Sequence, residues 1–259
     1  MNSVKKHILV GFGSLVALAC SAGEPQLDGE EGTTEASIST AAGTPGFATR
    51  YWDCCKPTCA WPQNTGGKTP ADSCSLNNAE LPDPMTANAC SGGSAYACWS
   101  FAPWQVSRNL AYGYAAAGGV PCGTCLRLDF TGLTHGSTST STAAHALRGK
   151  SMIVEVVTTG AVANNQVDLM IPGGGVGPFN ACAKQWGTND LGAQYGGFAT
   201  TCKGDKACIV NKCNAVFGNK PDLLAGCKWY AGWFNAADTP EFTSRQVACP
   251  AALRNRSGL

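Results

Sequence analysis

The chain has 259 residues, which is enough for one large domain or two small ones. Its 18 basic and 17 acidic residues give a formal net charge of +1, which provides no electrostatic attraction to nucleic acid or to an anionic membrane. The 15 cysteines indicate disulfides made in an oxidising compartment, and the 32 glycines predict many turns and irregular loops.

Residues 1–19 are typical of an export signal. Lys5-Lys6 precedes an apolar stretch, Ile8 to Ala19, that is too short to span a bilayer. The stretch ends in a small-x-small cleavage motif, Ala17-Leu18-Ala19, and Cys20 follows at once. Simple secretion and cleavage with a lipid anchor on Cys20 therefore stay open as alternatives. Both place the mature protein outside the cytoplasm, at the cell surface or beyond it.

Residues 20–46 are rich in Ser, Thr and Gly and carry acidic but no basic side chains. Such a segment buries too little apolar surface to offset its ordering entropy, so we predict a disordered linker. One main domain is expected at 47–253, followed by a C-terminal tail at 254–259. No internal repeat and no second domain are evident.

The main domain starts with a turn-rich, cysteine-held segment, and its apolar patterns predict the elements that follow. Near-helical spacing of apolar residues predicts a short helix within residues 102–117. Alternating or β-branched runs predict strands, with a solvated Ser/Thr loop at 136–142 between two of them. Many short strands with few helices favour a small β-barrel with large loops. The expected strands are 125–130, 151–158, 166–171, 228–234 and 243–248.

The segment Thr49 to Cys59, TRYWDCCKPTC, presents one carboxylate beside a cysteine cluster. Adjacent cysteines rarely bond each other, so Cys54 and Cys55 should reach different parts of the chain and fix Asp53 between them. A carboxylate held in this way next to aromatic rings suits a pre-organised catalytic site. The alternative is an ordinary surface aspartate in a loop.

A second carboxylate, Asp168, lies in the apolar run VDLMIPGGGVGPF. Desolvation there would raise its pKa, which suits a general acid. The Gly173–Gly175 turn fits a tight barrel crossover better than a phosphate loop, because no Lys-Ser/Thr follows it. Two carboxylates on distant rigid segments are typical of glycoside hydrolysis, in which one protonates the leaving oxygen and the other acts as base or nucleophile.

Taken together with QYGG at 194–197 and WFNAADTPEFTSRQVACP at 233–250, these motifs resemble the endoglucanases of glycoside hydrolase family 45, over roughly residues 48–253. The resemblance implies a six-stranded double-psi β-barrel with long disulfide-tied loops. It also implies a secreted endo-β-1,4-glucanase that inverts the anomeric centre, with Asp53 as general base and Asp168 as general acid. A β-1,4-glucan is then the partner, and we expect a monomer without cofactor or metal.

The resemblance also implies substrate-binding residues and disulfide pairs. Matching positions in the substrate groove are Thr49, Tyr51, Lys56, Trp61 and Tyr195. The implied bridges are Cys54–Cys182, Cys55–Cys90, Cys59–Cys122, Cys74–Cys98 and Cys125–Cys249. Two more bridges are expected among Cys202, Cys208, Cys213 and Cys227, whose pairing stays open.

The chain departs from the family pattern at two places near the expected acid. Many relatives carry an aspartate and a histidine where this chain has Ala161 and Gln166. The auxiliary carboxylate is therefore missing, while both principal acids remain, so activity is still expected. The competing interpretation is a non-hydrolytic expansin- or loosenin-like wall-loosening protein, although such proteins lack the segment that carries Asp53. A barwin-type defence domain is a third interpretation.

Overall fold

A computed structural model describes residues 43–259 except 138, 140, 161 and 164. The expected export signal, the acidic linker, Cys20 and Ala161 lie outside the described residues. No helix in the described part of the chain has the length and hydropathy that crossing a membrane requires.

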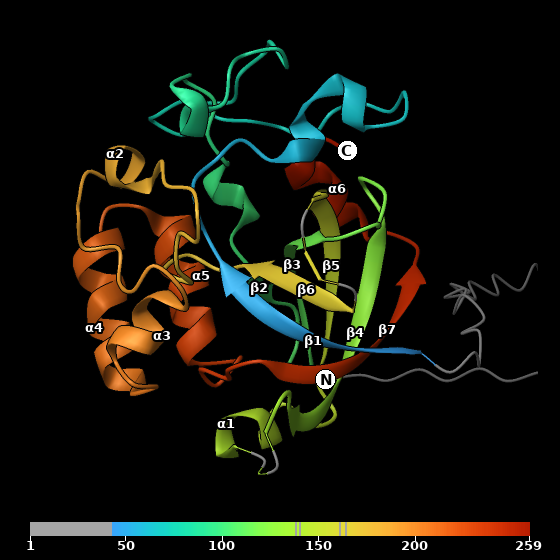
Figure 1. Cartoon of the computed structure of the whole chain (residues 1–259), viewed down its shortest axis with the longest axis vertical. Helices are drawn as coiled ribbons and strands as arrows, with labels where there is room; N and C mark the ends of the chain where they lie inside the picture. Colours follow the sequence, from blue (N-terminus) through green and yellow to red (C-terminus); the bar gives the residue numbers. More distant parts are fainter. Residues whose placement is uncertain (1–42, 138, 140, 161, 164) are drawn as a thin grey trace, which may run out of the picture. The chain divides into compact units, whose positions relative to one another are not determined.

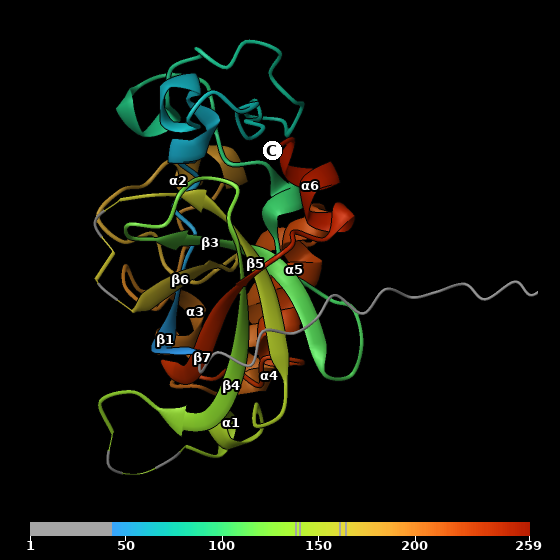
Figure 2. The same cartoon turned by 90° about the vertical axis from the view of Figure 1, so that its right-hand side faces the viewer.

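Six strands close into a barrel (Figures 1 and 2). They follow one another in the order β3-β5-β4-β7-β1-β6, and β6 pairs back to β3 to complete the ring. A two-residue strand, β2 (Trp104–Gln105), adds to the outer edge of β3. The predicted six-stranded barrel class is thus confirmed. The barrel strands are β1 (Thr44–Tyr51), β3 (Leu110–Ala117), β4 (Cys125–Thr134), β5 (Ser151–Thr158), β6 (Gln166–Met170) and β7 (Pro240–Val247).

The barrel interior is filled by side chains that alternate along the strands. On β5, for example, Met152, Val154 and Val156 are fully buried, and their branched or long apolar side chains suit a pleated sheet with a covered face. The strands predicted at 125–130, 151–158, 166–171 and 243–248 correspond to β4, β5, β6 and β7.

Two predicted elements are wrong. Residues 102–117 contain β2 and β3 rather than a helix, because β3 is bonded on one side to β5 and on the other to β6. These pairings outweigh the helix propensity of its alanines. Residues 228–234, predicted as a strand, lie mostly in helix α5, whose turns bury Trp229 and Tyr230.

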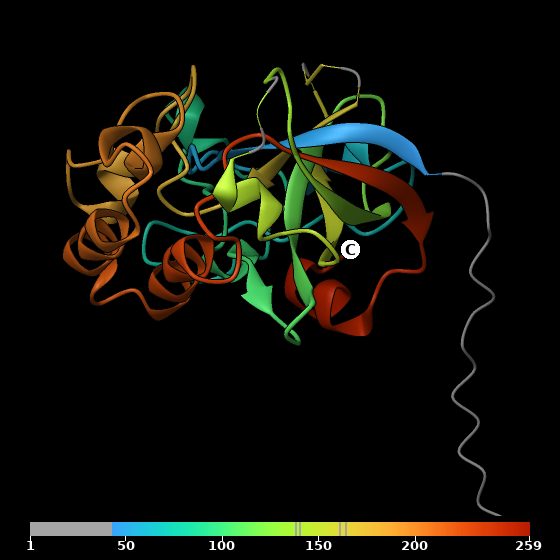
Figure 3. The same ribbon diagram turned by 90° about the horizontal axis from the view of Figure 1, so that it is seen from below.

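Helices cover one side of the barrel, where α2 to α5 gather (Figures 1 and 3). Asp205 caps α4 by accepting a hydrogen bond from the Cys208 backbone N–H, and proline starts α5 at its first position. The helices are α1 (Thr142–His145), α2 (Cys182–Trp186), α3 (Gly197–Thr201), α4 (Lys206–Phe217), α5 (Pro221–Ala231) and α6 (Ala251–Ser257).

Regular elements lie at both ends of the described part of the chain. Strand β1 already begins at Thr44, and the expected tail at 254–259 contains most of α6. The buried Ser257 donates a hydrogen bond of 2.7 Å to Glu155, which is fully buried on β5. This contact, with the Arg254–Glu155 ion pair at 3.0 Å, holds α6 on the barrel.

Among the described residues, seven disulfides cross-link the loops, the helices and strand β4. Five are the pairs that the resemblance implies. The remaining two, Cys202–Cys208 and Cys213–Cys227, settle the pairing that the sequence left open. The first closes the turn before α4, and the second joins α4 to α5.

Candidate active site

One face of β1 carries the groups that meet in the site. Thr49, Tyr51 and Asp53 follow one another at every second position, so they project to the same side, while Ala48 and Trp52 are buried on the other. The neighbouring strand β6 runs parallel to β1 and places Asp168 directly opposite Thr49. The two carboxylates that the sequence singled out therefore reach one surface from segments 115 positions apart in sequence: Asp168 lies on β6, and Asp53 lies two residues beyond the end of β1.

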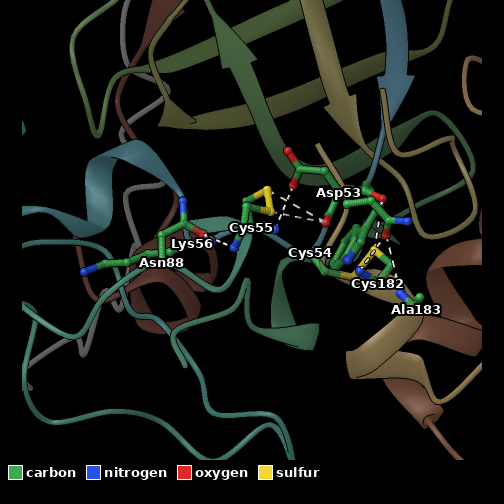
Figure 4. The surroundings of a disulfide bond; sticks show 10 residues. Asp53, Cys54, Cys55, Lys56, Asn88, Cys182 and Ala183 are labelled. Carbon is green, nitrogen blue, oxygen red and sulfur yellow. Dashed lines mark hydrogen bonds between the residues drawn. A yellow bond between two sulfur atoms is a disulfide. The ribbon is translucent and has the colours of Figure 1, made fainter. Parts of the chain in front are cut away.

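Backbone hydrogen bonds and two neighbouring disulfides hold Asp53 just after the end of β1 (Figure 4). The Cys55 N–H donates to Asp53 Oδ1 at 2.9 Å, and the Ala181 N–H donates to the Asp53 carbonyl at 2.9 Å. Cys54 has a φ of 63°, which turns the chain so that Cys54 and Cys55 point to different partners, Cys182 and Cys90. The carboxylate thus has little freedom to rotate away.

Burial raises the pKa of Asp53 to about 6, although the hydrogen bond from Cys55 opposes the rise. The hydroxyl of Tyr51 lies near both acids: burial first, then the negative charges of Asp53 and Asp168, raise its pKa well above the ordinary value. The phenol therefore stays protonated and can donate a hydrogen bond within the site.

Asp168 differs from the unpaired, desolvated carboxyl that its apolar run predicted. Its neighbours Val167 and Leu169 are buried, but strand alternation turns Asp168 to the outer face. There Oδ1 accepts hydrogen bonds from Thr49 Oγ1 and from Gln166 Nε2. Oδ2 has no hydrogen-bond partner among the described residues, and Asp168 lines the first of the cavities described below.

Two adjoining cavities form a trench over this face. The first has about 430 Å³ and is lined by both carboxylates, Thr49, Tyr51 and Gln166. The second has about 410 Å³ and shares Tyr51 and Asp53 with the first. Asp53 therefore stands where the two cavities meet. Gly174 and Gly175 line the first cavity close to the backbone of Tyr51 and of residues 194–197, where a side chain would not fit.

The residues predicted to bind substrate fall into three groups. Thr49, Tyr51 and Tyr195 line the first cavity, and Tyr195 is 68% exposed. Lys56 lines the second cavity but is only 2% exposed, because its ammonium donates to the carbonyls of Pro84 and Thr86 at 2.5 and 3.0 Å. Trp61 lines neither cavity; its ring packs on Lys56, with Nζ 3.4 Å from the ring centroid.

Three further residues of the trench were not predicted. Arg50 donates to Asp238 at 2.6 Å and to the Gly196 carbonyl at 3.3 Å, and it lines the first cavity together with Asp238. Phe179, 61% exposed, lines the second cavity. All three belong to motifs that the sequence analysis quoted, but their position in the trench depends on long-range folding.

The described residues include one group with three possible metal-binding side chains, Cys125, Glu155 and Cys249. The two cysteines are bonded to each other, so neither offers a thiolate, and Glu155 is engaged by Ser257 and Arg254. This group does not suit a metal ion.

Known proteins with similar sequences are named endoglucanases. An endoglucanase B of Cellvibrio japonicus is 46% identical over 234 residues, covering 84% of this chain and 46% of that protein. An endoglucanase of Cryptopygus antarcticus is 39% identical and covers 82% of this chain and 87% of that protein. The chain spans about half the length of the Cellvibrio relative and of a Fusarium oxysporum relative that is 40% identical.

A crystal structure of a cellulase from the Antarctic springtail Cryptopygus antarcticus superposes with a TM-score of 0.68 at 36% identity, covering 83% of this chain and 96% of that chain. The sequence model of glycosyl hydrolase family 45 matches residues 45–259, which is nearly the whole of the described part. This match agrees with the barrel, the disulfides and the pair of carboxylates in the trench. The chain therefore belongs to glycosyl hydrolase family 45.

Proposed function

We propose that this protein is an exported endo-β-1,4-glucanase that cleaves internal bonds of cellulose or a related β-glucan by a single, inverting displacement. The observation that carries the proposal is that Asp53 and Asp168 line one cavity of an extended trench. Family membership and the names of the relatives support the same activity. Seven disulfides support a location outside the cytoplasm.

In this mechanism Asp53 is the general base. Its ionised carboxylate takes a proton from a water molecule while that water attacks the anomeric carbon from one face of the sugar. A pKa of about 6 makes Asp53 a stronger base than an ordinary aspartate and still leaves it ionised near neutral pH. The hydrogen bond from Cys55 keeps Oδ1 oriented during the step.

Asp168 is the general acid and passes a proton to the glycosidic oxygen on the opposite face. The proton is carried by Oδ2, because Oδ1 already accepts from Thr49 and Gln166. An inverting reaction requires the two carboxyl groups to stand ~6.5–9.5 Å apart, so that the attacking water fits between them. Inversion predicts that the first product is the α-anomer, visible by NMR before mutarotation.

The two roles can be separated experimentally, because a raised pKa alone would also suit an acid. Asp53→Asn and Asp168→Asn should each abolish release of reducing ends from carboxymethylcellulose. An aryl cello-oligosaccharide with an acidic phenol as leaving group needs no proton donor. We therefore expect Asp168→Asn, and not Asp53→Asn, to keep activity on this substrate. If only Asp53→Asn keeps activity on the aryl substrate, the two roles are exchanged. Full activity of either variant on the polysaccharide would refute the mechanism.

The same assay separates the enzyme from a wall-loosening protein, which would release no reducing ends. The preferred glucan is decided by comparing carboxymethylcellulose, mixed-linkage β-glucan and glucomannan. We propose a monomeric enzyme without metal or cofactor, so treatment with a chelator should leave the rate unchanged.

A further inference from the structure

We propose that Phe47 and His135 form an additional sugar-binding platform, at which a β-glucan chain leaving the catalytic trench is gripped. This inference deepens the proposed glucanase function and rests on it. Neither residue belongs to the motifs that carry the family resemblance. His135 comes from the segment between β4 and α1, far from both carboxylates in sequence.

Phe47 continues the row of side chains that builds the catalytic trench. It stands two residues before Thr49 on the same outward face of β1, and its partner in the pairing with β6 is Gln166. Two residues of a strand span ~7 Å, so the Phe47 ring starts about that far from the level of Thr49 and Asp168. A chain bound across Asp168 and running along β1 would reach it.

His135 is stacked on the Phe47 ring. The two ring centroids are 3.7 Å apart and the rings are parallel to within 1°. The His135 N–H donates to the Thr239 carbonyl at 2.9 Å, and its Nδ1 lies 3.6 Å from Glu241 Oε1, so both backbone and side chain are held by the start of β7. Figures 1 and 2 show this end of β4 beside β7. Half of the His135 side chain is nevertheless exposed.

A cavity of about 440 Å³ opens over the stacked pair. Besides the two rings, its lining offers hydroxyl, amide and carboxylate groups that can bind the hydroxyls of a sugar while an aromatic face packs on the ring carbons. A neutral, hydroxyl-rich ligand suits this mixture of groups better than an ion or a purely apolar molecule. The polar lining residues are Thr131, Asn165, Glu241 and Thr243.

This cavity adjoins the catalytic trench along three segments of the chain. Thr49 comes two residues after Phe47, Gln166 directly after Asn165, and Thr239 two residues before Glu241. In each pair one residue lines the first catalytic cavity and the other lines this cavity. A single extended chain can therefore occupy both. This continuity favours the substrate itself as the occupant, rather than an unrelated partner.

The alternative is that the stacked pair only fastens the β4–α1 segment to the barrel. The two roles differ in their dependence on the length of the glucan, because losing a platform weakens only ligands that fill the catalytic trench and extend beyond it to Phe47, whereas losing a structural contact weakens ligands of every length. We would measure the dissociation constants of cellohexaose and cellotriose in the full chain carrying Asp168→Asn, with and without His135→Ala. The matched control is His145→Ala, which removes an exposed histidine of α1 that lines no part of this cavity.

We expect His135→Ala to weaken cellohexaose binding about five- to tenfold and to leave cellotriose binding unchanged. His135→Phe should restore the affinity, since it restores the stacked ring, and His145→Ala should bind both ligands normally. Equal loss for both oligosaccharides would indicate a purely structural role and would overturn the proposal, as would unchanged cellohexaose binding. If the unmodified chain releases no reducing ends although the length-dependent loss is seen, the glucanase activity fails while the platform stands.

Discussion

The hydroxyl of Thr49 donates a hydrogen bond to Oδ1 of Asp168 across directly opposed positions of the parallel strands β1 and β6. Gln166, two residues earlier on β6, donates to the same oxygen. Asp168 is thus oriented by a side chain of β1, the strand that leads directly to Asp53. The positions of the two carboxylates relative to each other therefore depend on the pairing register of β1 and β6.

Removing this hydrogen bond should slow the reaction without unfolding the barrel. We expect Thr49→Val, which keeps the shape of the side chain, to lower kcat about tenfold or more. In the proposed mechanism Asp168 becomes charged as it gives up its proton, and a hydrogen bond to a charged group contributes ~1.5–3 kcal/mol. Thr49→Ser retains the hydroxyl and serves as the control. Equal kcat values in the valine and serine variants would show that the contact does not orient the acid.

The raised pKa of Asp53 predicts that its ionised form, which the proposed base requires, makes the folded protein less stable near neutral pH. A pKa raised from 3.8 to about 6 means that the folded protein binds the proton more tightly than the unfolded chain does. The contribution of Asp53 to stability is therefore fully present below pH ~4 and is lost as the pH rises through about 6. Asp53→Asn, which cannot ionise, should be more stable at pH 7 by up to ~3 kcal/mol.

Denaturant unfolding of both proteins at pH 4 and pH 7 tests this expectation. The difference in free energy of unfolding should be fully present at pH 7 and reduced to about a fifth at pH 4, because Asp53 is then protonated in the folded state and close to half protonated in the unfolded chain. A variant that is less stable than the unmodified protein at pH 7 would contradict the assigned direction of the shift.

The same group should set the acidic side of the pH–rate profile. Because the base works only when ionised, kcat/KM should fall about tenfold for each pH unit below an apparent pKa near 6. Initial rates on a soluble β-glucan between pH 3.5 and 8 measure this limb. A rate that stays constant from pH 7 down to pH 4 would exclude Asp53 as a base with this pKa.

The disulfide beside Asp53 should matter more than the one at the edge of the helical side. Cys54–Cys182 links positions 128 residues apart, whereas Cys202–Cys208 spans six. Loop-closure entropy gives ~5 kcal/mol for the first and ~2 kcal/mol for the second. We expect the double alanine variant of the first pair to lose most of its stability and its activity. The double alanine variant of the second should remain folded and active, as thermal unfolding and reducing-end release would show.

Much of the site follows from the sequence, because its parts lie in short, unusual motifs. Adjacent cysteines single out Asp53, the apolar run singles out Asp168, and the resemblance of the whole pattern implies five of the bridges. The strands at 125–130 and 151–158 were also predicted, since their alternation is a local property of the chain.

Only the tertiary structure decided the features that depend on partners far away in sequence. Pairing with β5 and β6 made a strand of the alanine-rich residues 110–117, and the register of β1 with β6 set Thr49 against Asp168. The ammonium of Lys56 binds the backbone carbonyls of Pro84 and Thr86 because residues 84–86 fold over it, and it therefore does not project freely into the trench. Burial, which no local pattern reports, is also what raised the pKa of Asp53. Local patterns reveal which groups are available, whereas their environment is created by packing between distant segments.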